Sequence, residues 1–409
     1  MSAPRTIRRW LSSPRIWALV VALLVLRFVP AWWCRRAADT WSGRERAAAD
    51  ALATRVARWA ARPLRAKAFG TGSRRFDDEW VFGAYMMAAM GAGQLARAHS
   101  DHAARHLAEM RRAIAQATSA AARRFDREGW RGADPLETLG GEHSGRREVF
   151  AGDRSGRREV FAGDRGHAAY LGYLNLALSL ERSLDPATPN AKLNDRITRT
   201  LASRLARAEL ALVETYPGEL YPVDNCAVAA SIALHARATA NKQHLPAFAR
   251  FVRVLEKRYV APNGLLYQRV AAGSGAPVDA PRGSGSALAA YFLSFADQQL
   301  STRRYRAVRE ALVGSLLGFG MVREYARERV GRADIDSGPV VLGYGVSATG
   351  FAIGAARAHA DTRTFRSLYA TLHLFGAPHA AAAGELELLS GGPLGNAIAL
   401  AMLSAGATR

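Results

Sequence analysis

Apolar positions recur with a helical period along almost the whole chain. Leu52, Val56 and Trp59 follow the i, i+4, i+7 spacing ahead of Pro63, which predicts an amphipathic helix that ends before the proline. Similar patterns predict helices over 77–98, 100–124, 167–184, 191–215, 223–239, 245–259, 286–299, 303–318, 346–360, 362–374 and 394–404. Strand signals are sparse, and only 263–270, with an Asn-Gly turn, suggests a short hairpin arm. We therefore expect an all-α protein.

The spacing of the loops suggests how these helices are arranged. Long polar segments at 131–165, 216–222, 261–284 and 324–342 separate the helices into pairs. About a dozen helices in hairpins indicate an (α/α)6 toroid, which we place over residues 41–409. A helical solenoid is the alternative, but the sequence shows no repeat of about 33 to 47 residues.

One of these loops contains the same eleven residues twice. Ser144–Arg154 and Ser155–Arg165 both read SGRREVFAGDR. The second copy runs directly into the predicted helix at Gly166 and His167, so the first copy is the insertion. Because each doubling of a loop's length costs only about 0.6 kcal/mol, we interpret the repeat as a tolerated tandem duplication.

The N-terminus has the pattern of a membrane segment. Ile16–Leu26 is an unbroken apolar run of eleven residues, a length that suits a signal sequence. The nineteen residues from Ile16 to Cys34 are about enough to cross a bilayer, and Trp32 and Trp33 fit an interfacial belt. We find no small-x-small cleavage site. We therefore predict an uncleaved anchor over 1–36, with membrane lipid as its partner and the main domain outside the cytoplasm; a buried N-terminal helix is the alternative.

Composition narrows the classes of partner. The 409 residues carry a formal net charge of +21, which invites a nucleic-acid interpretation. The basic residues are almost all Arg scattered among Ala, however, and no nucleic-acid-binding motif accompanies them. We expect no nucleic-acid partner. Cys34 and Cys226 form neither a disulfide framework nor a zinc motif, and we interpret Cys226 as a core residue.

No metal or cofactor is predicted. His99, His102 and His106 have helical spacing but lie among charged residues, which is typical of a solvated face. The HExxH, GxSxG and P-loop motifs do not occur. Glycine-rich helix starts follow Arg282 and Ser390, where main-chain amides can receive an anion; we count Arg282 among the candidate substrate-binding residues.

Polar residues gather at the starts of several predicted helices and in one loop. Asp and Glu are common at helix starts, where they cap the helix. Each of these polar residues could therefore be a helix cap or part of a functional site. A neutral His at a helix N-terminus is suited to act as a base. The candidates are Glu79 and Tyr85; His167, Tyr170 and Tyr173; Tyr221, Asp224 and Asn225; and the loop residues Asp334 and Asp336.

Five stretches in order resemble the linalool dehydratase/isomerase-like domain family, over about residues 75–404. They are FDDEWVFGAYMM, GHAAYLGYLNLAL, YPVDNCAVAASIALH, ADIDSGPVVLGYGVSATGF and GGPLGNAIALAML. The resemblance implies a six-hairpin (α/α)6 toroid. It also implies active-site roles for Glu79 and Tyr85, places Tyr173 where the family has a His, and aligns Asp224 with one of two family cysteines. The other cysteine has no counterpart here, since Cys226 is two residues away.

The resulting set is rich in carboxyl groups, with Glu79, Tyr85, Tyr173, Asp224 and Asp336 as candidate catalytic residues. Two carboxyls with tyrosine donors suit general acid–base chemistry, and glycoside cleavage uses the same groups. We therefore expect a lyase, isomerase or hydrolase acting on a small neutral substrate, terpenoid or sugar-like. The alternative is a non-catalytic, membrane-anchored binding or interaction module. The oligomeric state stays open.

Overall fold

The computed structural model describes residues 14–42, 47–140, 147–151, 157–161, 166–327, 331, 337–381 and 384–406. Within this part of the chain, six helices form a closed inner ring: α5 (Arg74–Ala98), α8 (Ala168–Leu184), α10 (Pro222–Thr239), α12 (Gly283–Leu293), α14 (Val346–Ala358) and α16 (Gly392–Leu403). Each packs against the next, and α16 packs back against α5. Nearly every residue of α10 and α12 is buried, as expected for helices with apolar residues all round.

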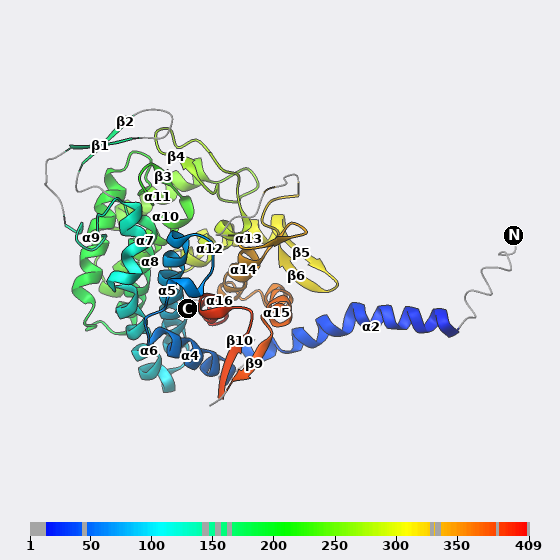
Figure 1. Cartoon of the computed structure of the whole chain (residues 1–409). Coiled ribbons are helices and arrows are strands. Elements are labelled where there is room, and N and C mark those ends of the chain that lie inside the picture. Colours follow the sequence, from blue (N-terminus) through cyan, green and yellow to red (C-terminus); the bar gives the residue numbers. More distant parts are fainter. Residues whose placement is uncertain are drawn as a thin grey trace.

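A second layer of amphipathic helices covers the inner ring (Figure 1). It consists of α4 (Ala47–Ala60), α6 (Ala103–Ala117), α9 (Ala191–Arg207), α11 (Leu245–Val254), α13 (Gln298–Leu312) and α15 (Thr362–Gly376), and α7 (Ala120–Gly129) lies against α5. Each outer helix buries one stripe and leaves a polar face to solvent. The chain therefore alternates outer and inner helices, and the predicted all-α (α/α)6 toroid is confirmed.

The ring closes through a very close approach of two helices. A Cβ at Gly91 of α5 would lie 2.6 Å from Leu400 Cγ and 3.0 Å from the Ala401 amide nitrogen of α16. Gln94 of α5 donates to the Ala401 carbonyl oxygen at 2.8 Å. A glycine at this position lets the first and last inner helices touch, which joins the two ends of the toroidal chain.

Short strands connect some helices. The two-stranded ladders are β3 (Glu219–Leu220) with β4 (Val270–Ala271), β5 (Val313–Leu316) with β6 (Phe319–Val322), β7 (Val340–Val341) with β8 (Tyr344–Gly345), and β9 (Pro378–Ala381) with β10 (Glu385–Leu388), all antiparallel. The expected hairpin arm at 263–270 is partly present, since Val270 begins β4. The helix predicted over 303–318 ends earlier, at Leu312, because β5 takes up the following Val and Gly residues.

The two copies of the repeat pair with each other. β1 (Arg147–Ala151) comes from the first copy and β2 (Arg157–Phe161) from the second. They form an antiparallel ladder in which Arg147 lies opposite Phe161. Figure 1 shows this ladder at the periphery, away from the inner ring.

The N-terminal helix α2 (Pro14–Arg36) projects from the toroid (Figure 1). It is long and apolar enough to cross a membrane, a test that a signal sequence near an N-terminus also passes. Leu19 is 60% exposed and Leu23 is 56% exposed, so the alternative of a buried N-terminal helix is wrong. Its C-terminal part packs against α15, and Arg35 donates to the Gly318 carbonyl between β5 and β6. Nearby, Trp41 Nε1 donates to the Tyr369 hydroxyl at 3.0 Å.

Candidate active site

A cavity of about 810 Å³ lies where the inner helices begin. Every inner helix contributes residues from its N-terminal half, among them Glu79, Tyr173, Asp224, Ser284, Ser347 and Leu394. The inner helices are therefore parallel, with their N-terminal ends around one chamber. Each N-terminus carries a partial positive charge, so the helix ends can stabilise negative charge that develops on a bound molecule.

Asp224 is the most constrained carboxyl group in this cavity. Tyr173 donates its hydroxyl to Asp224 Oδ1 at 2.7 Å, and Thr215 donates to Oδ2 at 2.7 Å. Burial raises the pKa of Asp224, while the hydrogen bonds from Thr215 and Tyr173 act in the opposite direction. Asp224 lies in the first turn of α10, so its side chain has both a fixed direction and an increased affinity for a proton.

A second carboxyl group, Glu79 of α5, lines the same cavity beside a cation. Tyr216 places its hydroxyl 3.3 Å from Glu79 Oε2, and Arg75 stacks over the Tyr216 ring at 3.8 Å from its centroid. Burial opposes the charge on Arg75, but Tyr216, Glu79 and Glu219 together raise the pKa of the guanidinium. Arg75 is thus held charged among these groups, and Glu79 raises the pKa of its guanidinium more than Glu219 does.

Glu219 is a third carboxyl at the cavity wall. Tyr221 donates its hydroxyl to Glu219 Oε2 at 2.9 Å, and burial, followed by the charge of Glu219, raises the pKa of Tyr221. Tyr221 therefore stays protonated and acts as a donor. The remaining wall is largely apolar; Trp80 meets Phe69 edge-on with ring centroids 6.2 Å apart.

Four of the residues predicted from the sequence therefore meet in one cavity: Glu79, Tyr173, Tyr221 and Asp224. Three others face away. Tyr85 donates to the Arg62 carbonyl and accepts from the Leu64 amide, because α5 begins before both Glu79 and Tyr85 and turns them to different sides. Tyr170 donates to the Ala117 carbonyl, and Asn225 holds the main chain of Val213. These three side chains support the fold and do not line the cavity.

His167 also lies outside the cavity, fully buried between the ring and its outer layer. Its Nδ1 hydrogen-bonds Asp126 Oδ2, and its ring lies 4.8 Å from that of Trp130. Burial, with a further contribution from Asp134, raises the pKa of Asp126. This buried pair ties α7 to the start of α8, and His167 does not line the cavity in which the sequence suggested a substrate contact.

The remaining residues predicted from the sequence do not line the cavity or lie outside the described part of the chain. Arg282 precedes α12 but is absent from the cavity wall; its guanidinium lies over the Tyr325 ring at 5.8 Å. Asp334 and Asp336 lie outside the described residues. Cys226 is fully buried, and burial raises the pKa of its thiol, which confirms its interpretation as core.

Sequence reasoning missed several cavity residues. Arg75, Thr215, Tyr216, Gln268 and Trp80 all line the chamber, although the apolar pattern around Trp80 indicates a core position. Tyr216 and Glu219 belong to one loop with two tyrosines and two X-Pro steps. These features of the loop could have pointed to Tyr216 and Glu219 as cavity residues.

A separate correction concerns the histidines. His106 is fully buried, so its predicted place on a solvated face is wrong.

Comparison with known proteins assigns no family to the chain. No family model matches the chain, and no curated protein matches it. One solved structure with similarity is the GH76 alpha-mannanase BT2949 of Bacteroides thetaiotaomicron, at 8% sequence identity and a TM-score of 0.44. The match covers 79% of this chain and 84% of that one.

Proposed function

We propose that this protein is an acid–base enzyme, a lyase, isomerase or hydrolase, that acts on a small neutral molecule in the cavity at the N-terminal ends of the inner helices. The observation that carries the proposal is the Asp224 carboxyl, held by two hydroxyl donors in a chamber that also contains Glu79. A pair of carboxyls in different environments is the arrangement that separates an acid from a base.

The two carboxyls have different assigned roles. Burial favours the protonated form of Asp224, so Asp224 is the general acid that gives its proton to a leaving oxygen. Glu79, next to the Arg75 guanidinium, is the base. In a hydrolase it takes a proton from the attacking water. In a lyase it takes a proton from the carbon adjacent to the one that bears the departing oxygen, so that the C–H electron pair forms the double bond as the C–O bond breaks. In both cases Asp224 loses one proton and Glu79 gains one, so the net charge of the pair is unchanged. Proton exchange with solvent then returns Asp224 to its protonated form and Glu79 to its charged form.

The cavity wall narrows the substrate. Tyr173, Tyr221 and Gln268 offer hydrogen bonds, while Trp80, Phe69, Leu288 and Phe351 offer apolar surface. This combination suits a molecule with hydroxyl groups and an apolar face, such as a sugar ring or a terpenoid alcohol. The resemblance to the linalool dehydratase/isomerase-like family favours the terpenoid alcohol, and the sugar is the alternative. We further propose that α2 anchors the toroid on the extracytoplasmic side of a membrane.

A paired substrate screen tests the proposal. The full-length protein in detergent is incubated with a panel of neutral glycosides and terpenoid alcohols, and products are measured by mass spectrometry. Asp224→Asn is run in parallel, with Asp195→Asn as the matched control, because Asp195 lies on the outer helix α9 with its side chain 41% exposed and paired with His235, outside the cavity. We expect turnover of at least one compound class that falls about 100-fold or more in Asp224→Asn and is unchanged in Asp195→Asn.

The same screen distinguishes the binding-module alternative. Saturable binding of a panel compound without turnover in the wild-type protein would contradict catalysis and favour an anchored binding module. Turnover that survives Asp224→Asn unchanged would contradict the assignment of the acid.

A further inference from the structure

A cluster of metal-ligand side chains lies on the outer layer, at the end of the ring opposite the cavity. Glu79 lies in the second turn of α5, and His102 follows the end of that helix. At about 1.5 Å per residue the helix separates the two by about 28 Å or more. Asp50 comes from α4, His102 from the short turn η2 (Ser100–His102) and His106 from α6. This cluster takes no part in the proposed chemistry.

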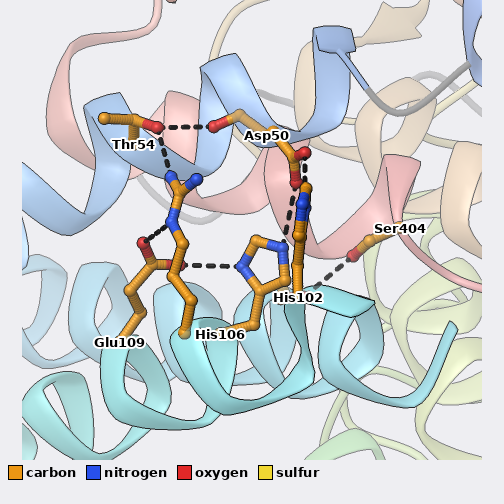
Figure 2. A network of polar contacts seen from close by, with 8 residues as sticks. Asp50, Thr54, His102, His106, Glu109 and Ser404 are labelled. Atoms are coloured by element: carbon orange, nitrogen blue, oxygen red, sulfur yellow. Dashed lines mark hydrogen bonds and ion pairs between the residues drawn. The ribbon is translucent and has the colours of Figure 1, made fainter. Parts of the chain in front are cut away.

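Three ligand atoms converge in this cluster (Figure 2). His102 Nδ1 lies 2.9 Å from Asp50 Oδ2, and His106 Nε2 lies 3.0 Å from Asp50 Oδ1. When each of the three residues offers one ligand atom, the three atoms lie within 4.8 Å of one another. In a tetrahedral zinc site with bonds of about 2.0–2.1 Å, neighbouring ligand atoms are about 3.3 Å apart. The side chains therefore need only small rotations to surround one ion.

Glu109 supplies the carboxylate that commonly hydrogen-bonds the second ring nitrogen of a metal-bound histidine. His106 is fully buried, and its other ring nitrogen, Nδ1, lies 2.9 Å from Glu109 Oε2. A carboxylate on the far nitrogen fixes the tautomer and orientation of a metal-ligating imidazole. In Figure 2 the two imidazoles rise from one helix layer toward Asp50, which reaches down from α4, and Glu109 lies on the opposite side of His106.

The local charge and exposure also suit a divalent cation. Arg105 donates to Glu109 at 3.1 Å. When both imidazoles are neutral, the two carboxylates of Asp50 and Glu109 and the guanidinium of Arg105 have a net charge of −1. His106 is buried, whereas His102 is 44% exposed. The cluster is thus open on the His102 side, where water can complete the coordination.

We propose that Asp50, His102 and His106 bind a divalent transition metal ion, Zn²⁺ by the chemistry of its ligands, with Glu109 as the positioning residue for His106. Two imidazole nitrogens and one carboxylate oxygen form a ligand set that Zn²⁺ and its analogue Co²⁺ accept. The ion joins α4, the first helix of the toroid, to α6, and its role is structural.

The test uses Co²⁺ as a spectroscopic probe and Zn²⁺ as its competitor. The full-length protein, purified in detergent without a polyhistidine tag and stripped with a chelator, is titrated with Co²⁺ while visible d–d absorption is recorded. We expect saturable binding of one equivalent, displaced by Zn²⁺, and an increase in melting temperature on Zn²⁺ addition, because an ion that binds only the folded chain stabilises it. Binding should weaken at low pH, since protons compete for the ligands.

Variants distinguish Co²⁺ binding at this cluster from nonspecific binding of Co²⁺ at the protein surface. His102→Ala should remove the d–d bands and the Zn²⁺-dependent increase in melting temperature. Glu109→Gln should weaken Co²⁺ binding about 10–100-fold. His99→Ala, three residues before His102 and outside the cluster, should bind as the wild type does. The proposal is overturned if no saturable Co²⁺ binding occurs, or if His102→Ala binds Co²⁺ with wild-type affinity while remaining folded by circular dichroism.

Discussion

Asp224 shows how position in the fold changes an ordinary side chain. An Asp in the first turn of a helix is commonly a cap, yet Asp224 hydrogen-bonds Tyr173 and Thr215 and faces the cavity. Burial raises its pKa even though both hydroxyl donors favour the charged form. The fold therefore increases the proton affinity of the carboxyl that we propose as the general acid.

This shift has a consequence for stability. An unfolded Asp has a pKa of about 3.9, so the folded chain binds the Asp224 proton more tightly than the unfolded chain does. The stabilisation from the protonated carboxyl is complete below that pH and is lost as the pH rises through the higher folded pKa. Asp224→Asn cannot lose a proton, so its stability relative to the wild type should increase from pH 4 towards neutrality. Urea unfolding of both proteins across this range measures the difference; a flat or opposite trend would contradict the raised pKa.

Some of the candidate residues predicted from the sequence line the cavity, because the start of a helix can be predicted from the sequence. Glu79, Tyr173 and Asp224 each stand near the beginning of a predicted helix, and those beginnings converge on the cavity. Tyr85 and Tyr170 were misplaced because the rotation of a helix about its axis depends on its neighbours. Tyr170 is three residues before Tyr173 yet turns to the Ala117 carbonyl. Arg75 and Tyr216 meet only through tertiary packing, which no local pattern reports.

Among the elements, the inner helices were the most predictable and the junctions the least. The pattern over 100–124 was predicted as one helix, but the structure breaks it into α6 and α7, because Ser119 caps α7 by accepting from the Ala122 amide. The helix predicted over 191–215 ends at Arg207, and the residues that follow include Thr215, which contacts Asp224. Such ends are set by caps and contacts rather than by apolar spacing.

The closure between α5 and α16 can be tested at one glycine. Gly91→Ala places a methyl group against Leu400 and the Ala401 amide, so we expect a loss of about 1–3 kcal/mol in unfolding free energy. A Cβ at Gly350 of α14 would meet no atom within 4 Å. Gly350→Ala should therefore be neutral or stabilise by up to about 1 kcal/mol. Chemical unfolding of both variants checks this; equal effects would contradict a tight contact at Gly91.

The duplicated segment is expected to be dispensable. Deletion of Ser144–Arg154 removes β1 and leaves β2 without its partner, but the ladder lies outside the inner ring. The melting temperature should stay within about 2 °C of the wild-type value, since a change of 1 kcal/mol shifts that of a large domain by only about 2–4 °C. Circular dichroism on heating measures it. A loss of folding would show that the repeat is an integral part of the toroid.

For the molecule as a whole, the toroid could be predicted because a dozen helical patterns in hairpins have few ways to bury their apolar faces. The particular contact that closes the ring could not be predicted, since it joins Gly91 to residues more than 300 positions away along the chain. The apolar run of the N-terminal helix could equally be predicted. Its series of exposed large apolar residues contrasts with the described residues of the inner helices, where Val346 alone among the large apolar residues is exposed.

The anchor is tested by placing charge within it. Val21 and Leu24 are about half exposed, and an Arg at the centre of a membrane helix costs about 2.5–3.5 kcal/mol. The double variant Val21→Arg, Leu24→Arg should be extracted from membranes by alkaline carbonate, whereas the wild type is retained. Val278→Arg, at an exposed apolar residue of the toroid, should behave as the wild type. Retention of the double variant would contradict insertion of α2.

The most direct test of the catalytic account compares binding and chemistry at Asp224 on one compound. Affinity and single-turnover rate are measured for the first substrate found, in the wild type and in Asp224→Asn. We predict that the rate falls about 100-fold or more, as for the loss of a general acid, while the affinity changes only a few-fold. A rate that is unchanged in Asp224→Asn, or that falls only in step with affinity, would show that the Asp224 carboxyl binds the ligand without acting on it.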